Sequence, residues 1–185
     1  MSTTTLEREI KLRFTSAAEA RDAILQTRAT LLRGRRLQED CLLDTADNRL
    51  RDQRSVLRVR MDQGRSFLTY KGPVQPSPFK LREERETVVG DGEMMLSILE
   101  RLGFTVWFRY QKYREEFGAL DAVIALDETP IGTFVEIEGG EQAIASIAVA
   151  LGRGEADYIT ESYRGLYVQH CAATGTEMRN MVFEE

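Results

Sequence analysis

Two glutamates near the start of the chain have a type and spacing that could do chemistry. Glu7 and Glu9 lie in the stretch 6–14, where polar and apolar residues alternate. A period of two predicts a β-strand, in which side chains at i and i+2 share a face about 7 Å apart. Carboxylates held this close repel each other unless a cation joins them. The pair indicates either the solvated face of a sheet or a site for cations.

The same arrangement of charges returns along the chain in other segments predicted to be strands. Each places charged residues at i and i+2 on the face opposite an apolar row, as Arg58 and Arg60 do beside Leu57 and Val59. The cations found in this way are Lys11, Arg58, Arg60, Lys71, Arg82, Lys112 and Arg114, and the anions are Glu7, Glu9, Glu84, Glu86, Asp127, Glu136 and Glu138. A solvated sheet face usually carries more Thr, Ser and Gln, so this density favours the charged interior of a closed sheet.

A ligand that satisfies both signs of charge is a polyphosphate with a divalent metal ion. Arginine and lysine bind phosphate oxygens, and arginine can do so with two parallel hydrogen bonds. Paired carboxylates hold Mg²⁺ or Mn²⁺, which in turn bridge phosphate groups. Few other ligands would use both sets of side chains.

The elements that must position these residues are short strands joined by hairpins, with a few helices. Strands are predicted over about 6–14, 37–44, 55–62, 66–71, 79–89, 104–117, 119–126 and 133–138, and helices over about 16–27, 91–102, 144–151 and 160–172. In the second helix, Met95, Ile98, Leu99 and Leu102 are expected to face the core. Trp107 could stack on an organic moiety such as thiamine or adenine, but its parity is opposite to that of Lys112 and Arg114, which favours packing on the outer face. This order predicts an α+β fold on a mostly antiparallel sheet.

Composition limits the class of protein. The 185 residues fit one domain over 1–173, and the tail over 174–185 has no pattern and is expected to be flexible. The net charge of −5 argues against non-specific binding to nucleic acid. Cys41 and Cys171 have no metal-ligand spacing and form no disulfide framework. With neither a membrane-spanning run nor a signal peptide, the expectation is a cytoplasmic protein, monomeric or homodimeric, that binds no membrane.

These segments also carry a resemblance. The motif from Glu7 to Lys11 resembles the ExExK signature of the CYTH domain, or triphosphate tunnel metalloenzyme, superfamily. Further segments follow in that family's order: Leu57-Arg58-Val59-Arg60, Thr69-Tyr70-Lys71, Lys80-Leu81-Arg82-Glu83-Glu84-Arg85-Glu86, Lys112-Tyr113-Arg114, Leu126-Asp127, Val135-Glu136-Ile137-Glu138 and Ser162-Tyr163-Arg164. The resemblance implies a closed eight-stranded antiparallel tunnel, flanked by helices, that binds triphosphate compounds with a divalent metal.

The resemblance also implies roles for individual residues. Metal ligands would be Glu7, Glu9, Glu136 and Glu138, with Asp127 and Glu84 as additional ones. The triphosphate would be held by Arg58, Arg60, Lys71, Arg82, Lys112 and Arg114. Lys11 would help to activate the attacking water in hydrolytic members.

The charged residues and the resemblance are compatible with three functions. A triphosphatase would hydrolyse inorganic triphosphate or thiamine triphosphate, and a class IV adenylyl cyclase would convert ATP to cyclic AMP and pyrophosphate. Many bacterial cyclases of this kind carry a His-Phe pair just ahead of ExExK, whereas residues 1–5 contain neither, which favours the triphosphatase. A non-catalytic polyphosphate or nucleotide sensor is disfavoured, because every expected charged position is filled.

Overall fold

The computed structural model describes residues 5–184, so the first four residues of the predicted domain and residue 185 lie outside it. The strands are β1 (Thr5–Phe14), β2 (Thr30–Thr45), β3 (Val56–Asp62), β4 (Arg65–Lys71), β5 (Lys80–Val89), β6 (Phe104–Ala119), β7 (Ala122–Thr129) and β8 (Gly132–Glu138). The helices are α1 (Ala17–Gln26), α2 (Arg49–Asp52), α3 (Gly92–Arg101), α4 (Glu141–Ala150) and α5 (Tyr163–Thr174), with a 3₁₀ turn over Glu155–Asp157.

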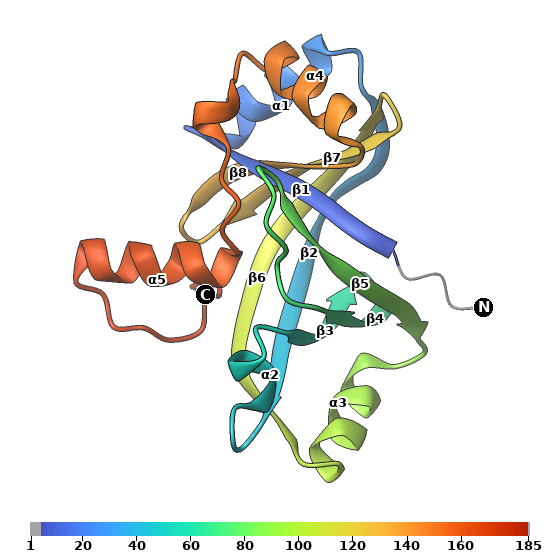
Figure 1. Cartoon of the computed structure of the whole chain (residues 1–185), viewed down its shortest axis with the longest axis vertical. Helices are drawn as coiled ribbons and strands as arrows, with labels where there is room; N and C mark the ends of the chain where they lie inside the picture. Colours follow the sequence, from blue (N-terminus) through green and yellow to red (C-terminus); the bar gives the residue numbers. More distant parts are fainter. Residues whose placement is uncertain (1–4, 185) are drawn as a thin grey trace.

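The eight strands close into an antiparallel barrel. Their order around it is β1-β5-β4-β3-β2-β6-β7-β8, and β1 pairs with both β5 and β8 to complete the circle. The long strands β2 and β6 run along the centre of the molecule (Figure 1). α1 and α4 lie together at one end of the molecule, and α3 lies at the other. The predicted α+β fold with a closed eight-stranded barrel is confirmed.

Local signals explain most of the element boundaries. Ser16 caps α1 by accepting a hydrogen bond from the backbone N–H of Glu19, as its position before an apolar helical pattern indicates. The turn between β3 and β4 uses Gln63 and Gly64, both with positive φ, as tight hairpin turns require. The last helix starts later than predicted, because Ser162 caps it with its side chain on the N–H of Gly165.

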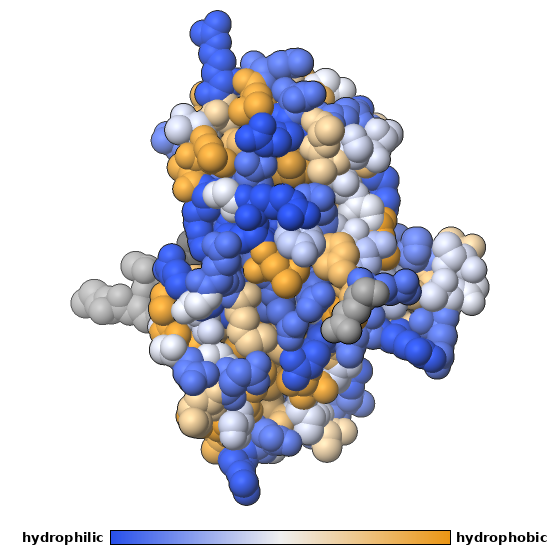
Figure 2. Space-filling model, turned by 180° about the vertical axis from the view of Figure 1, so that it is seen from behind, coloured by the Kyte–Doolittle hydropathy of each residue, from blue (hydrophilic) through white to orange (hydrophobic). Residues whose placement is uncertain are grey.

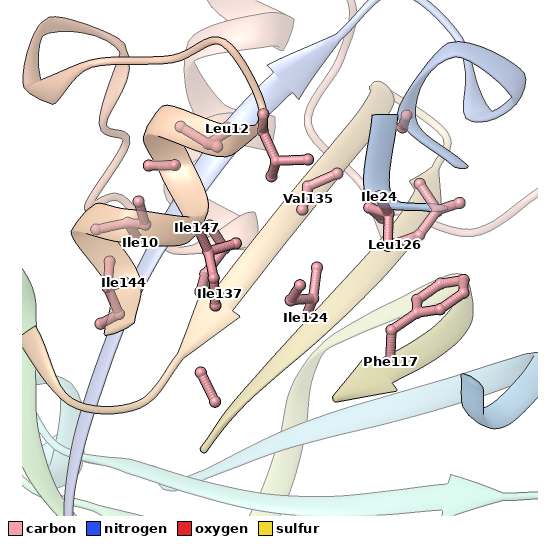
Figure 3. Packing of buried hydrophobic residues seen from close by; sticks show 14 of the residues in the cluster. Ile10, Leu12, Ile24, Phe117, Ile124, Leu126, Val135, Ile137, Ile144 and Ile147 are labelled. Atoms are coloured by element: carbon pink, nitrogen blue, oxygen red, sulfur yellow. The ribbon is translucent and has the colours of Figure 1, made fainter. Parts of the chain in front are cut away.

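Apolar rows on the outer faces of the strands pack against the helices. The largest cluster joins β1, β7 and β8 to α1 and α4, and Figure 3 shows its side chains converging between these elements. Its members include Ile10, Leu12, Ile24, Phe117, Ile124, Leu126, Val135, Ile137, Ile144 and Ile147. A second cluster packs α3 on β2 and β3 through Cys41, Leu43, Val59, Leu96 and Leu99. Because the outer faces are apolar, the charged residues of the same strands face the inside of the barrel.

The predicted inner face of α3 is partly wrong. Leu99 is buried as expected, but Ile98 is 46% exposed and Leu102 is 68% exposed, while Leu96 is buried. The rotation of the helix is set by its first turn. There a Cβ on Gly92 would lie 2.7 Å from Ser66 Oγ, so the backbone at the start of the helix is in close contact with the hairpin of β3 and β4.

The segment after α5 lies along β6. Met181 is buried, its N–H donates to the carbonyl of Arg109, and its carbonyl accepts from the N–H of Gln111. Seen from behind, the molecular surface is mostly hydrophilic, and its hydrophobic residues form small separate patches (Figure 2). Within residues 5–184, no helix is long and apolar enough to cross a membrane.

Candidate functional site

A cavity of about 970 Å³ runs inside the barrel. Twelve of the thirteen predicted site residues line it: Glu7, Glu9, Lys11, Arg58, Arg60, Lys71, Arg82, Glu84, Lys112, Arg114, Glu136 and Glu138. The thirteenth, Asp127, is fully buried behind Lys112 and Arg114. The structure therefore brings together side chains that lie up to about 130 positions apart in the sequence, because β1 is paired to β8.

Four glutamates from β1 and β8 lie within electrostatic reach of one another. Glu9 is the ladder partner of Glu138, and Glu136 is the partner of Lys11. Partial burial at the rim of the barrel and the negative charges of Glu7 and Glu136 raise the pKa of Glu138 to about 7. Among the described residues, Glu138 forms no ion pair. Crowded carboxylates of this kind are oxygen donors that suit a hard divalent cation.

The other three glutamates are already paired with cations. Glu7 accepts from Lys71 Nζ at 2.5 Å and from Arg82 Nε at 3.1 Å. Glu9 accepts from both Lys11 and Lys80 at 2.7 Å. These pairs hold the carboxylates apart, and within residues 5–184 no three His, Cys, Asp or Glu side chains are gathered closely enough to hold a metal ion. The donor chemistry fits a divalent metal, provided that the lysines and arginines turn away from the carboxylates.

Lys11 is a buried cation between two carboxylates. Its Nζ lies 2.7 Å from Glu9 and 3.2 Å from Glu136. Burial alone would lower the pKa of Lys11, but the charges of these two glutamates outweigh it and raise the pKa well above its ordinary value. Lys11 is therefore fully charged in this geometry, which suits charge neutralisation better than proton removal.

The pKa values of two other lysines in the tunnel are lowered, in contrast to that of Lys11. Burial, with the positive charge of Arg114 nearby, lowers the pKa of Lys112 to about 8. Burial lowers the pKa of Lys80 to about 8 as well, against the attraction of Glu9 and with smaller contributions from the positive charges of Lys11 and Arg82. Sequence reasoning missed Lys80 as a site residue, although it shares a strand face with Arg82 and Glu84.

Asp127 organises the cations of β6. It accepts from Lys112 Nζ at 3.0 Å, from Arg114 Nε at 2.7 Å and from the hydroxyl of Tyr163 at 2.6 Å. Burial would raise the pKa of Asp127, but Arg114 and Lys112 keep it below its ordinary value, so the carboxylate is charged. With its oxygens used by these donors, Asp127 orients Lys112 and Arg114 in the tunnel wall.

Asp40 does the same for the arginines of β3, and sequence reasoning missed it. Asp40 is fully buried, and its Oδ1 lies 2.8 Å from Arg60 Nε and 3.3 Å from Arg58 Nε. Burial opposes the charge, but Arg60 and Arg58 lower the pKa of Asp40 below its ordinary value. The signal was available: Gln38, Asp40 and Leu42 alternate with outward residues in a segment predicted to be extended.

Trp107 packs against the hydrophobic cluster of Phe108, Tyr110 and Tyr167, and it also lines the cavity, which the parity of the strand did not favour. Leu42 pairs with Phe108 but Leu43 pairs with Val106, so β6 has one extra residue, a β-bulge, at Trp107. The bulge shifts the parity of the strand and lets the indole line the cavity beside Arg51, Arg54 and Arg164. Parity counted along the sequence cannot detect a bulge of this kind.

Comparisons with known proteins agree with this geometry. The CYTH domain model matches residues 5–163. A protein of Methanocaldococcus jannaschii named "Putative adenylate cyclase" is 34% identical over 105 residues, which are 56% of this chain and 60% of that protein. The chain thus spans about 60% of the length of this curated relative.

Solved structures share the fold. The PH1819 protein of Pyrococcus horikoshii superposes with a TM-score of 0.74 at 26% identity, covering 89% of this chain and 99% of that one. A protein from Hippeastrum superposes with a TM-score of 0.62 at 18% identity, covering 94% and 97%. It is described as a "putative adenylyl cyclase" with a dominant triphosphatase activity. Because the family model matches most of the chain and the charged tunnel has formed, the chain belongs to the CYTH domain family.

Proposed function

We propose that this protein is a divalent-metal-dependent triphosphatase that hydrolyses a phosphoanhydride bond of a triphosphate compound. The observation that carries the proposal is the meeting of two charge sets in one cavity. Arginines and lysines from β3, β4, β5 and β6 face four glutamates from β1 and β8. Phosphoryl transfer depends mainly on positioning the phosphates and stabilising the charge on their oxygens, and this wall offers both.

The glutamates Glu7, Glu9, Glu136 and Glu138 would hold the metal, either Mg²⁺ or Mn²⁺. When bound, the metal neutralises phosphate charge and activates a water molecule. Lys71 and Arg82 form ion pairs with Glu7, and Lys80 forms an ion pair with Glu9. In the loaded protein these cations would turn to the phosphate oxygens. Ion pairs with Asp40 and Asp127 would orient Arg60 and Arg114 toward the same part of the cavity.

Within this proposal, Lys11 holds charge and does not remove a proton. Its two carboxylate partners keep it protonated, so it would orient the terminal phosphate or the attacking water by donating hydrogen bonds. Lys112 and Lys80, whose pKa values are lowered to about 8, are closer to the range of a general base at neutral pH. Glu84 and Asp127 contact cations and would support the wall without being metal ligands.

The second candidate is an adenylyl cyclase, favoured by the name of the archaeal relative. The same wall could hold ATP while its 3′-hydroxyl attacks the α-phosphorus and pyrophosphate leaves. A sensor without turnover is the third candidate. In all three cases the expected location is the cytoplasm and the expected partner is a small triphosphate compound.

A screen of metals against substrates tests these candidates. Purified protein with Mg²⁺ or Mn²⁺ is given inorganic triphosphate, thiamine triphosphate or ATP, and orthophosphate, pyrophosphate and cyclic AMP are measured separately. A triphosphatase releases orthophosphate. Release of pyrophosphate with cyclic AMP would establish the cyclase instead, and binding with no product under any metal would establish the sensor.

A further inference from the structure

One mouth of the tunnel is rich in arginine and has an apolar floor. We call it the arginine mouth and define it by Arg51, Arg54, Trp107 and Arg164, which line the cavity together. Arg51 comes from α2 and Arg164 from the first turn of α5, so two helices meet over the bulge of β6.

The guanidinium groups are arranged around the indole ring. The central carbon of Arg51 lies 4.4 Å from the ring centroid of Trp107, and that of Arg164 lies 4.7 Å from it. Both distances are typical of cation–π contacts, and such stacking leaves the N–H edges of a guanidinium free to donate. Arg51 is fixed from behind by Asp44, at 3.2 Å from its Nε.

Arg164 has donors that nothing in the described chain uses. Its Nε is buried without a hydrogen-bond partner, and the guanidinium forms no ion pair with any residue from 5 to 184. A buried donor without an acceptor is unfavourable, so it marks a position where a ligand acceptor would be stabilising. Arg54 is exposed beside it on the rim.

The floor of the arginine mouth is apolar. Leu42 and Val56 line the cavity next to Trp107. An apolar floor with a few directed donors suits a flat, uncharged ring that carries acceptor atoms. A bare phosphate would gain nothing from the floor, and a cationic ring such as the thiazolium of thiamine would be repelled by the three arginines.

We propose that the arginine mouth is a specificity-determining subsite that binds the nucleobase of a nucleoside triphosphate and discriminates against thiamine triphosphate. This inference rests on the proposed function, because it assumes that the triphosphate lies in the tunnel. The base would pack on Leu42, Val56 and Trp107, and its ring nitrogens or carbonyl oxygens would accept from Arg164. The chain's own substrate would then be a nucleotide.

The single tryptophan of the chain makes this testable by fluorescence. Wild-type protein with Mg²⁺ is titrated with ATP, inorganic triphosphate and thiamine triphosphate, and calorimetry gives each Kd. ATP is expected to change the emission of Trp107, whereas saturating inorganic triphosphate leaves it near the value of the free protein. Thiamine triphosphate is expected to bind more weakly than ATP.

A variant and a matched control sharpen the test. Arg164→Gln is expected to raise the Kd of ATP about tenfold and that of inorganic triphosphate less than about twofold. Arg153→Gln is the control, since Arg153 also stacks on an aromatic ring, that of Phe14 at 4.8 Å, but does not line the cavity. It is expected to change neither Kd.

Several results would overturn the subsite. The first is an equal loss of affinity for ATP and for inorganic triphosphate in Arg164→Gln. The second is an unchanged Kd of ATP in that variant. The third is a Kd of thiamine triphosphate as low as that of ATP. Because these experiments measure binding and not turnover, failure of the proposed triphosphatase function can be distinguished from failure of the proposed subsite. If ATP binds as described and no metal supports turnover, the triphosphatase proposal fails and the subsite stands.

Discussion

Glu138 and Glu7 belong to the same proposed metal site but are held by the protein in opposite ways. Glu7 is buried between Lys71 and Arg82, whereas Glu138 forms no ion pair among the described residues, and repulsion by Glu7 and Glu136 exceeds its attraction to Lys71. Because the pKa of Glu138 is raised to about 7, ionising it lowers the free energy of unfolding as the pH rises from the ordinary carboxyl pKa, and this loss is complete above about pH 7. Function at this residue is therefore opposed to stability.

Substitution of the two glutamates should separate these effects. Glu138→Gln is expected to abolish metal-dependent turnover while raising the melting temperature of the metal-free protein at neutral pH, because it removes a repulsive charge. Glu7→Gln is expected to abolish turnover and lower the melting temperature, because it leaves Lys71 and Arg82 with a weakened partner. Turnover assays and thermal melts of both variants check this. Full activity in Glu138→Gln would refute the metal assignment.

Helix α5 packs on the barrel through an apolar cluster and reaches the charged tunnel wall through the buried hydroxyl of Tyr163. The residues leading into it are fixed to β1 by two backbone hydrogen bonds between Lys11 and Ile159. Tyr163 then reaches Asp127 and lies with its ring centroid 5.0 Å from Lys112 Nζ. The helix thereby contributes to the orientation of cations on β6.

Tyr163→Phe tests this link. Loss of a hydrogen bond to a charged acceptor is expected to cost about 1.5–3 kcal/mol of stability. It should also raise the KM for triphosphate with a smaller effect on kcat, because Lys112 and Arg114 lose part of their support. Tyr167→Phe is the matched control on the same helix, since the hydroxyl of Tyr167 makes long backbone contacts, at 3.5 Å with the carbonyl of Asn180 and at 3.4 Å with the N–H of Arg179, and neither belongs to the tunnel wall. Equal KM values in wild type and Tyr163→Phe would remove Tyr163 from the site.

The short helix α2 depends on one carboxylate. Asp44 is buried and accepts from the backbone N–H groups of Thr45, Leu50 and Arg51. Burial would raise the pKa of Asp44, but these hydrogen bonds lower it below its ordinary value. An acid with a lowered pKa stabilises the fold above its unfolded-state pKa, and this stabilisation is lost as the pH falls through the folded-state pKa.

Asp44→Asn should therefore destabilise the protein by about 1–2 kcal/mol at pH 7, and the difference from wild type should shrink below about pH 4. Denaturant unfolding at several pH values measures it. Asp47→Asn, an exposed neighbour in the same loop, is the control and should show no such trend. A difference that stays constant down to acid pH would contradict the account.

The sequence could predict the barrel and most of its inner wall, because alternation carries that information strand by strand. The recurring pairs from Glu7 to Glu138 were sufficient to place twelve side chains in the cavity. What alternation could not predict depends on contacts between elements. The bulge that turns Trp107 inward reflects how β6 fits β2, and the rotation of α3 reflects where Gly92 meets Ser66. Alternation does place Asp40 on the inner face of β2, but its ion pairs with Arg58 and Arg60 depend on β2 lying beside β3.

Across the barrel as a whole, most charged side chains of the tunnel are joined in a network of ion pairs. Burying so many charges is costly unless they are paired, and pairing through side chains leaves the crowded Glu138 unsatisfied. A metal together with a triphosphate supplies a partner for both charge sets at once, so the loaded state should be the more stable one.

Thermal melts test this coupling. Mg²⁺ with triphosphate, at about 100 times the Kd, is expected to stabilise the protein by about 2.7 kcal/mol, which corresponds to roughly 5–10 °C for a domain of this size. Either component alone should give a smaller shift. Additive shifts from the two separate ligands would show that they bind without contact, contrary to the proposed bridging.

The closure of the barrel through β1 also has a consequence for the order in which the protein is made. β1 is synthesised first, yet its two neighbours, β5 and β8, end at residues 89 and 138. The ribosome must therefore complete three quarters of the chain before Glu7 and Glu9 can meet Glu136 and Glu138. Until β5 is made β1 has two unpaired edges, and until β8 is made it keeps one unpaired edge and carries acidic side chains with no counterparts from β8. Biogenesis of the barrel and assembly of its proposed metal site are thus a single late event.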